Sequence, residues 1–255
     1  MTIDDGSDAI DAAARSLRRA GSVVVFTGAG VSAESGIPTF RSGENALWAN
    51  SDIEQFANPR GYRRRAPDAW QWYARRAQIA REARPNLAHE AIRDIELHVP
   101  EFLLITQNID GLHHRAGNTK VLELHGTLRR ARCFDCRNYI EWPDPPGAPV
   151  CMNCGGMLRP DVVMFEEELP PGAMDTALAV ARSCDVLLSV GTSNVVWPAA
   201  EIPHAAMRAG ATVIVINPDL EGQPWGRNTI AVAASAGAAL PSIIAKAWRA
   251  DEATG

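Results

Sequence analysis

Two pairs of cysteines stand in the middle of the chain at a spacing that could hold a metal ion. Cys133 and Cys136 form a Cys-x-x-Cys pair, and after fourteen residues Cys151 and Cys154 form a second one. Four thiolates at this spacing are typical of a tetrahedral zinc site. Because four cysteines leave no coordination position open, we expect the zinc to be structural rather than catalytic. A redox dithiol, the alternative, would need a thioredoxin-like sequence around one pair, and that context is missing.

A glycine-rich stretch, GAGVSAESGIPTFR at residues 28–41, follows the short apolar run at residues 23–26. Gly28, Gly30 and Ala33 match the G-x-G-x-x-G/A pattern of loops that bind the pyrophosphate of a dinucleotide. Glycines there let backbone N–H groups approach the phosphates, and a helix that begins after them adds a favourable dipole. A tight turn between a strand and a helix, with no ligand, explains the same pattern.

The acidic residue that an ordinary dehydrogenase uses to bind the ribose is missing from its usual place. It should end a second strand about 20 residues after the glycines, but the chain runs on into a helical pattern instead. Asn217 and Asp219, which follow the apolar run at residues 213–216, are better candidates for ribose contacts. Ligands of such sheets bind at the carboxyl ends of the strands, which is where these two residues fall.

Amides, a carboxylate and an imidazole follow two further apolar runs. Gln107, Asn108 and Asp110 come directly after one run, and His125 follows the next. The carboxyl ends of parallel strands meet at one edge of a sheet, so these side chains should converge on the nucleotide cleft. Together they could perform general acid–base catalysis, with His125 as the base because the unperturbed pKa of histidine is about 6.5. The alternative is that they are hydrogen-bonded turn and cap residues.

Five short apolar runs alternate with helical patterns and indicate the fold class. The runs lie at residues 23–26, 102–105, 121–124, 186–190 and 213–216. Continuous apolar strands of this length are typical of a parallel sheet that is buried on both faces. Helical patterns lie between several of the runs. We therefore expect an α/β fold, a Rossmann-type doubly wound parallel sheet, which brings the glycines and the polar residues to one edge.

Two segments break this alternation. Residues 42–85 carry a helical pattern without a strand, and residues 129–158 carry the cysteine pairs and a proline-rich loop. We interpret them as a helical insert and a zinc-binding insert, because so short a segment with few core residues needs a metal to fold. The Rossmann-type domain then comprises residues 1–41, 86–128 and 159–255.

Composition excludes several classes of protein. The 255 residues are 46% hydrophobic and 22% charged, with a formal net charge of -5. These values are ordinary for a globular protein and provide no attraction to nucleic acid or to an anionic membrane. No window is long and apolar enough to span a bilayer, and the acidic N-terminus is unlike a signal or transit peptide. We expect a cytoplasmic monomer without direct nucleic-acid or membrane partners.

Taken together, the motifs resemble those of the sirtuins, the NAD-dependent protein-lysine deacylases. The matching stretches run in the family's order and cover almost the whole chain: GAGVSAESGIPTFR, TQNIDGLHHRAG, ELHG, the two cysteine pairs, RPDVVMFEE, GTSNVVWPAA and INPD. The resemblance implies a Rossmann-type domain with a small module formed by the two inserts. It also implies NAD as co-substrate, one structural zinc, and acyl-lysine proteins or peptides as substrates that enter the cleft opposite NAD.

The resemblance assigns residues of this chain to the family's functions. The implied NAD site consists of the glycine-rich loop, polar strand ends and a helix start, namely Gly28, Ala29, Gly30, Glu34, Ser35, Thr39, Phe40, Arg41, Gln107, Asn108, Ile109, Asp110, Gly191, Thr192, Ser193, Asn217, Pro218, Asp219 and Ala236. Catalysis is assigned to His125 and Asn108. The acyl oxygen attacks C1′ of the nicotinamide ribose, and His125 then takes a proton from the ribose hydroxyl that attacks the acyl carbon. The implied products are free lysine, nicotinamide and O-acyl-ADP-ribose.

A tyrosine and an arginine predict which acyl group is removed. Tyr73 and Arg76 lie three residues apart on a predicted helix and share one face, where a phenol and a guanidinium suit a carboxylate. On the helix alone, a packed Tyr73 beside a solvated Arg76 is the simpler interpretation. The pair, however, resembles the Tyr-x-x-Arg of the class III sirtuins, which remove succinyl and malonyl groups. Ala57 matches their small residue that admits a longer acyl chain, and Val162 and Phe165 match the substrate-binding strand.

These matches predict a desuccinylase and demalonylase with some deacetylase activity. One departure is that Met164 and Glu166 replace an aromatic residue and a glycine of the family. A carboxylate beside the peptide groove would disfavour acidic substrates, so an enzyme that is mainly a deacetylase is one alternative. A protein ADP-ribosyltransferase, which shares the first chemical step, is another. An NAD-dependent oxidoreductase or a nucleic-acid-binding regulatory domain fits the motifs less well.

Overall fold

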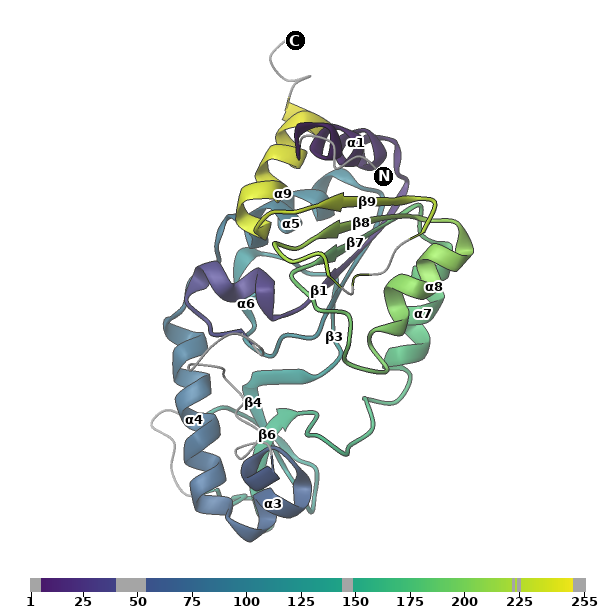
Figure 1. Cartoon of the computed structure of the whole chain (residues 1–255). Helices are drawn as coiled ribbons and strands as arrows, with labels where there is room; N and C mark the ends of the chain where they lie inside the picture. Colours follow the sequence, from purple (N-terminus) through teal and green to yellow (C-terminus); the bar gives the residue numbers. More distant parts are fainter. Residues whose placement is uncertain (1–5, 40–53, 144–148, 222, 224–225, 250–255) are drawn as a thin grey trace.

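The computed structural model of the chain describes residues 6–39, 54–143, 149–221, 223 and 226–249. Its larger part is a parallel sheet with the strand order β3-β2-β1-β7-β8-β9, whose β1, β7, β8 and β9 are labelled in Figure 1. The strands are Ser22–Thr27 (β1), Glu101–Thr106 (β2), Val121–Glu123 (β3), Val186–Val190 (β7), Thr212–Ile216 (β8) and Thr229–Val232 (β9). The five apolar runs of the sequence are all strands of this sheet, as predicted.

Helices cover both faces of the sheet because its central strands are apolar on both sides. Every residue of β7 is buried, and so is every residue of β1 after Ser22. Helices α1 (Gly6–Arg19), α5 (Leu87–His98) and α9 (Ala236–Ile244) pack on one face. Helices α7 (Ala173–Ser183) and α8 (Glu201–Ala209) pack on the other, as Figure 1 shows. The predicted doubly wound α/β fold is confirmed.

The strand order reverses between β1 and β7. From β1 the chain extends the sheet to β2 and β3 on one side, and β7 begins the other half with β8 and β9. In sheets of this kind, ligands bind in the crevice outside the carboxyl ends of the strands at the reversal point. Gly28 follows β1 and Gly191 follows β7 at this crevice. The fold therefore places the predicted nucleotide loop where a ligand site belongs.

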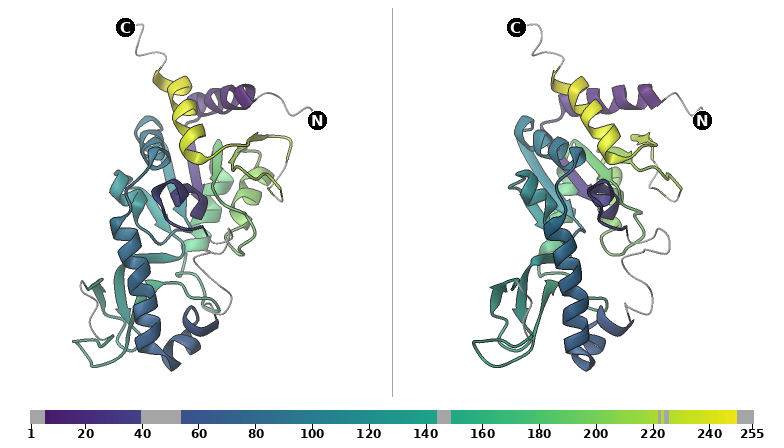
Figure 2. Two further views of the ribbon diagram at one scale, coloured as in Figure 1. Left: turned by 60° about the vertical axis from the view of Figure 1, so that its left-hand side comes forward. Right: turned by 90° about the vertical axis from the view of Figure 1, so that its left-hand side faces the viewer.

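A second, smaller body extends from the sheet domain, and Figure 2 shows it at the end of the molecule away from both termini. It combines an antiparallel sheet in the order β5-β4-β6 with two helices in one shared core. Its elements are Pro59–Arg64 (α3), Ala66–Glu82 (α4), Gly126–Cys133 (β4), Tyr139–Glu141 (β5) and Leu158–Val162 (β6). Trp70 stacks on Trp142 with ring centroids 4.6 Å apart, and the Tyr62 hydroxyl donates to the Leu158 carbonyl oxygen at 2.9 Å.

These contacts join helices of the first predicted insert to strands of the second. Two strands of the small sheet, the central β4 and the outer β6, extend beyond the predicted limits of the zinc-binding insert, since β4 begins at Gly126 and β6 ends at Val162. The division of the chain into domains at residues 129 and 158 stays a prediction.

Some local features differ from the expectations. The glycine-rich stretch itself forms a 3-10 helix, η1 (Ala29–Ser35), which ends at Gly36 with φ 81°. Strand β9 was not expected. The short helix α6 (Leu112–Ala116) follows β2, and η2 (Ala245–Arg249) continues α9. Within the described ranges, no helix is long and apolar enough to cross a membrane.

Candidate active site

The loops after β1 and β7 touch each other, and glycines make this contact possible. Gly28 N donates to the Val190 carbonyl oxygen at 3.1 Å, and Gly30 N donates to the Gly191 carbonyl oxygen at 2.8 Å. A Cβ atom on Gly30 would lie 2.7 Å from that same oxygen, and one on Gly28 would lie 2.8 Å from Thr192 Cβ. Such distances leave room only for glycine. The glycine pattern is therefore required for the packing of the two loops at the crevice.

Amide side chains at the end of β2 hold these loops in place. Gln107 donates through Nε2 to Thr192 Oγ1 at 2.9 Å. Asn108 donates through Nδ2 to the Gly28 carbonyl oxygen at 3.1 Å. From the far side, Asn217 after β8 donates through Nδ2 to the Thr192 carbonyl oxygen at 2.9 Å. The structure thus brings together polar side chains from the ends of β2, β7 and β8 and the glycine backbone at the end of β1.

Asp110 is a half-buried carboxylate within this polar group. It accepts hydrogen bonds from Ser32 Oγ at 2.8 Å and from Leu112 N at 2.9 Å. Burial raises the pKa of Asp110, and the two hydrogen bonds oppose that rise. Ser32 Oγ also accepts from Asn108 Nδ2 at 3.2 Å and lies 3.5 Å from His89 Nε2. Ser32 could have been found inside the glycine-rich stretch, whereas His89 carried no signal beyond its helical pattern.

His125 follows β3, and a backbone oxygen fixes its imidazole. His125 Nδ1 lies 3.0 Å from the Gln107 carbonyl oxygen. Because a carbonyl oxygen can only accept, Nδ1 carries the proton and Nε2 keeps its lone pair. Burial lowers the pKa of His125 from 6.5, against the smaller opposing effect of this hydrogen bond. The ring is therefore neutral at pH 7 and can accept a proton at Nε2, as a general base must.

A cavity of about 1190 Å³ opens at the crevice. Its wall includes most residues predicted for the NAD site together with the predicted base, namely Gly28, Ala29, Gly30, Thr39, Gln107, Asn108, Ile109, Asp110, His125, Gly191, Thr192, Ser193, Asn217 and Asp219. Three of the residues predicted to contact substrate, Arg76, Val162 and Phe165, line the same cavity. Residues predicted to bind the dinucleotide and residues predicted to bind the substrate therefore share one cavity.

Several predicted site residues do not line this cavity within the described part of the chain, namely Glu34, Ser35, Ala57, Tyr73, Pro218 and Ala236. The Glu34 carboxylate instead accepts from Gly237 N at 2.7 Å and from Ser235 Oγ at 2.9 Å, at the start of α9. Asn86 Nδ2 donates to Ser35 Oγ at 2.9 Å. These contacts give the two side chains structural partners. Phe40 and Arg41 lie outside the described residues.

The two residues predicted to recognise an acyl carboxylate lie on α4. The Arg76 guanidinium stacks 3.3 Å from the centroid of the Trp72 ring and donates through Nη1 to the Trp72 carbonyl oxygen at 3.0 Å. Tyr73 is fully buried, with its ring edge-on to Trp72 at 4.7 Å, and burial raises its pKa. Ala57 is also buried, and its carbonyl oxygen accepts from Phe165 N at 2.8 Å.

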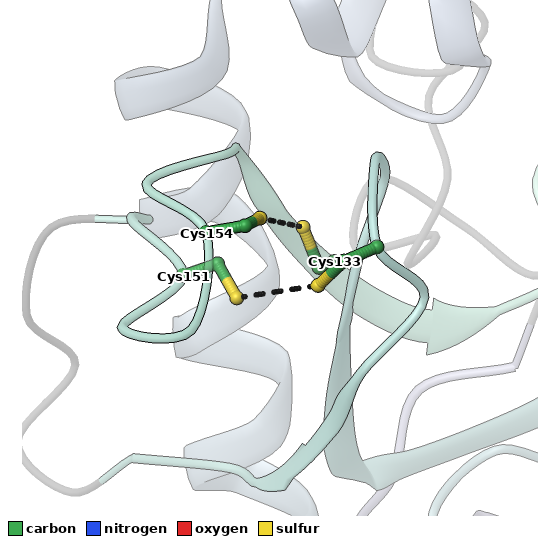
Figure 3. A group of neighbouring side chains, drawn as sticks. Cys133, Cys151 and Cys154 are labelled. Carbon is green, nitrogen blue, oxygen red and sulfur yellow. Dashed lines mark hydrogen bonds between the residues drawn. The ribbon is translucent and has the colours of Figure 1, made fainter.

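The four paired cysteines form a cluster in the small module. Their sulfur atoms lie within 4.8 Å of one another, with 3.6 Å between Cys133 and Cys154 and 3.7 Å between Cys136 and Cys151. Figure 3 shows Cys133, Cys151 and Cys154 with their sulfurs turned toward one centre. Sulfurs about 2.3 Å from a tetrahedral zinc are about 3.8 Å apart, so the donors fit this metal. Backbone amides of Asp135 and Gly156 donate to Cys133 Sγ and Cys154 Sγ, which supports thiolate ligands.

The doubly wound sheet has a crevice at its reversal point with a neutral imidazole beside it, and the small module has a four-cysteine cluster. Together they indicate a nucleotide-dependent enzyme with a cluster that fits a structural metal. A family model described as "Sir2 family" matches residues 28–198. An NAD-dependent protein deacylase of Aquifex aeolicus is 46% identical over 200 residues, which cover 77% of this chain and 83% of the relative.

Solved structures are similar in the same way. A serine-to-alanine mutant of a Sir2 homologue, in complex with ADP-ribose, has a TM-score of 0.87 and 39% identity, with 94% of this chain and 96% of that chain covered. Sir2Af2 bound to a myristoylated histone peptide has a TM-score of 0.77 and 34% identity, with 97% and 99% covered. This chain belongs to the Sir2 family. It is an NAD-dependent protein deacylase with a four-cysteine cluster that fits a structural zinc.

Proposed function

We propose that this deacylase removes succinyl and malonyl groups from lysine side chains, with some activity on acetyl-lysine. The observation that carries the proposal is Arg76, which is the only arginine or lysine that the described part of the chain contributes to the cavity wall. A cation in a cavity otherwise rich in apolar and acidic residues is the natural partner for an acyl group that ends in a carboxylate. Of the Tyr-x-x-Arg pair that carries the class III resemblance, Arg76 lines the cavity, whereas Tyr73 is buried outside its lining.

The reaction that we infer uses the groups on the cavity wall. NAD, as co-substrate, supplies an electrophilic C1′ from which nicotinamide departs when the acyl oxygen attacks. Gln107 and Asn108 hold the loops that would surround the dinucleotide. His125 Nε2 then removes the proton from a ribose hydroxyl, and that oxygen attacks the former acyl carbon. The lysine nitrogen then leaves that carbon as the free amine and a water molecule adds to it, so that the products are free lysine, nicotinamide and O-acyl-ADP-ribose.

The role of Arg76 can be measured with matched peptides. We expect Arg76→Met to lower kcat/KM for a succinyl-lysine peptide roughly 10- to 150-fold. This corresponds to about 1.5–3 kcal/mol of lost transition-state stabilisation, because a charge-assisted contact is removed. The kcat/KM for the acetyl-lysine peptide of the same sequence should change little. Arg75→Met, which removes an exposed guanidinium from the same helix, is the control. An unchanged succinyl rate in Arg76→Met would remove this residue from the proposed role.

Product masses separate the alternatives. A desuccinylase lowers the mass of a succinyl-lysine peptide by 100 mass units, the succinyl group, only when NAD is present. An ADP-ribosyltransferase instead raises the mass of the peptide by that of ADP-ribose. An enzyme that is mainly a deacetylase would process the acetyl peptide with the larger kcat/KM, and Glu166 on the cavity wall is the feature that favours this outcome. The monomeric state and the cytoplasmic location stay predictions from the sequence.

A further inference from the structure

An ion pair between a buried arginine and a half-buried glutamate joins the small module to the cavity wall. Arg159 on β6 is 2% exposed, and its guanidinium binds both carboxylate oxygens of Glu167, with 2.7 Å between Nη2 and Oε2. Arg159 Nη2 also donates to the Val162 carbonyl oxygen at 2.6 Å. Burial alone would raise the pKa of Glu167, but the hydrogen bonds from Arg159 and Met164 N hold it below its usual value. Glu167 is therefore ionised at pH 7.

The ion pair holds a tight turn at residues 164–167. Glu167 Oε2 accepts from Met164 N at 2.9 Å, and Glu167 N donates to the Met164 carbonyl oxygen at 3.1 Å. The turn contains Glu166 in a left-handed conformation with φ 71°. Because the first and last residues of the turn bind each other twice, the position of Glu167 determines the position of the whole turn.

Backbone amides on either side of Met164 connect the turn to the backbone of His125 and of Ala57. Val163 N donates to the His125 carbonyl oxygen at 2.8 Å, and Phe165 N donates to the Ala57 carbonyl oxygen at 2.8 Å. Val163, Phe165 and His125 all line the cavity. A shift of this turn would therefore move the cavity wall and the backbone of the catalytic base together.

The other end of the ion pair is anchored in the core of the small module. The Arg159 guanidinium lies 4.9 Å from the centroid of the Phe134 ring, and Phe134 stands between Cys133 and Cys136. Buried ion pairs contribute little to stability relative to apolar residues of similar size, because the charges must be desolvated. An ion pair that contributes little to stability can still fix one arrangement of the chain.

We propose that Arg159 and Glu167 are positioning residues that hold the Met164–Glu167 turn in register with His125 and Ala57 for acyl-lysine binding. They act through the backbone of the turn. Their charges bind each other, and Arg132 Nη2 lies 3.9 Å from Glu167 Oε2. The proposal rests on the deacylase activity of the family and is independent of the succinyl preference. An acetyl-lysine peptide is therefore the substrate for its test, so that failure of the acyl prediction leaves this test unaffected.

The test compares three variants. In Arg159→Met/Glu167→Met, apolar side chains replace the pair, and we expect an unfolding temperature close to that of the parent. The KM for the acetyl-lysine peptide should nevertheless rise about 10- to 100-fold, because the turn is no longer held. The Kd for ADP-ribose, measured by calorimetry, should stay at the parental value. Glu141→Gln, on an exposed residue of β5, is the control with unchanged KM.

Glu167→Gln, which keeps the shape of the side chain, provides a second measurement if the double variant does not fold. We expect faster hydrogen exchange at the Val163 and Phe165 amides and a higher KM for the peptide. A stable double variant with the parental KM would overturn the proposal. Unchanged hydrogen exchange at both amides in Glu167→Gln would also overturn it. So would an equal loss of affinity for the peptide and for ADP-ribose, since the ion pair would then serve stability alone.

Discussion

The hydrogen-bond partner of His125 Nδ1 determines the tautomer of the ring and influences its pKa. That partner is the Gln107 carbonyl oxygen, which carries a partial charge rather than the full charge of a carboxylate. A carboxylate would stabilise the imidazolium and raise the pKa of the ring. With only a carbonyl oxygen, burial dominates and lowers the pKa of His125 below 6.5. The tautomer is fixed, and the ring stays unprotonated at lower pH than a solvated histidine would.

This arrangement predicts the acid side of the pH–rate profile. We expect kcat/KM to fall with an apparent pKa below 6.5, because protonated His125 cannot accept the proton of a ribose hydroxyl. His125→Ala should lower kcat by about 100- to 10,000-fold and remove this dependence on pH. Initial rates between about pH 5 and 8 measure both effects. His98→Gln, at an exposed histidine of α5, is the control, and an acid limb that persists in His125→Ala would contradict the assignment.

Between β6 and α7, the turn at the cavity wall includes a residue in an unfavourable conformation. Glu166 has φ 71°, which side chains with a Cβ atom rarely adopt. The family resemblance places a glycine at this position, and glycine adopts that conformation without strain. The ion pair of Arg159 and Glu167 and the contact of Phe165 with Ala57 hold the turn in spite of this cost.

Replacing Glu166 by glycine should therefore stabilise the protein. We expect Glu166→Gly to raise the free energy of unfolding by about 1 kcal/mol, because relief of the left-handed strain exceeds the entropy that glycine loses on folding. Urea unfolding followed by circular dichroism measures the change. Glu166→Gln is the control that removes the charge and keeps the strain, so it should leave stability unchanged.

The same two variants separate strain from charge in catalysis. Both remove a carboxylate from the cavity wall, so both should increase kcat/KM for succinyl peptides relative to acetyl peptides, by up to about tenfold for loss of one repulsive contact. If Glu166→Gln stabilised the protein as much as Glu166→Gly, charge repulsion at Glu166, and not its backbone conformation, would be the cause of the destabilisation.

Across the whole molecule, features that depend on local sequence were predictable and features that depend on distant contacts were not. Strand β7 is buried on both faces, so it appears as a continuous apolar run. Strand β9 lies at the sheet edge with only Val232 buried, and its short run of mixed residues gave no comparable pattern. Gln107 and His125 could be placed because each follows a strand.

The contacts that complete the site join segments far apart in the chain. Nothing in the local sequence around Phe165 indicates that its N–H would reach the Ala57 carbonyl oxygen. The Glu34 carboxylate, which the resemblance assigns to the NAD site, accepts from Gly237 N, a residue some 200 positions later. The sequence indicated which side chains could take part in chemistry. The direction in which each side chain points could be learned only from the fold.

The two bodies of the molecule have separate cores, and only one of them contains the cysteine cluster. The core of the small module includes Cys133 and Cys151 together with Tyr62 and Trp70. Removal of a structural metal from such a cluster should disrupt that core, since metal binding supplies much of the folding free energy of small metal-dependent modules. The six-stranded sheet has its own apolar clusters on both faces and needs no metal to keep them.

Chelation of zinc should therefore abolish deacylation while the sheet domain stays folded. We expect an excess of chelator, or the variant Cys136→Ser, to remove activity on acyl-lysine peptides, because α4 and the turn at residues 164–167 lose their support. ADP-ribose should still bind, since its loops belong to the sheet, and calorimetry can measure this while metal analysis counts the zinc released. Cys184→Ala, in the core of the sheet domain, should retain the metal. Simultaneous loss of ADP-ribose binding and activity on chelation would show instead that the two bodies unfold as one unit.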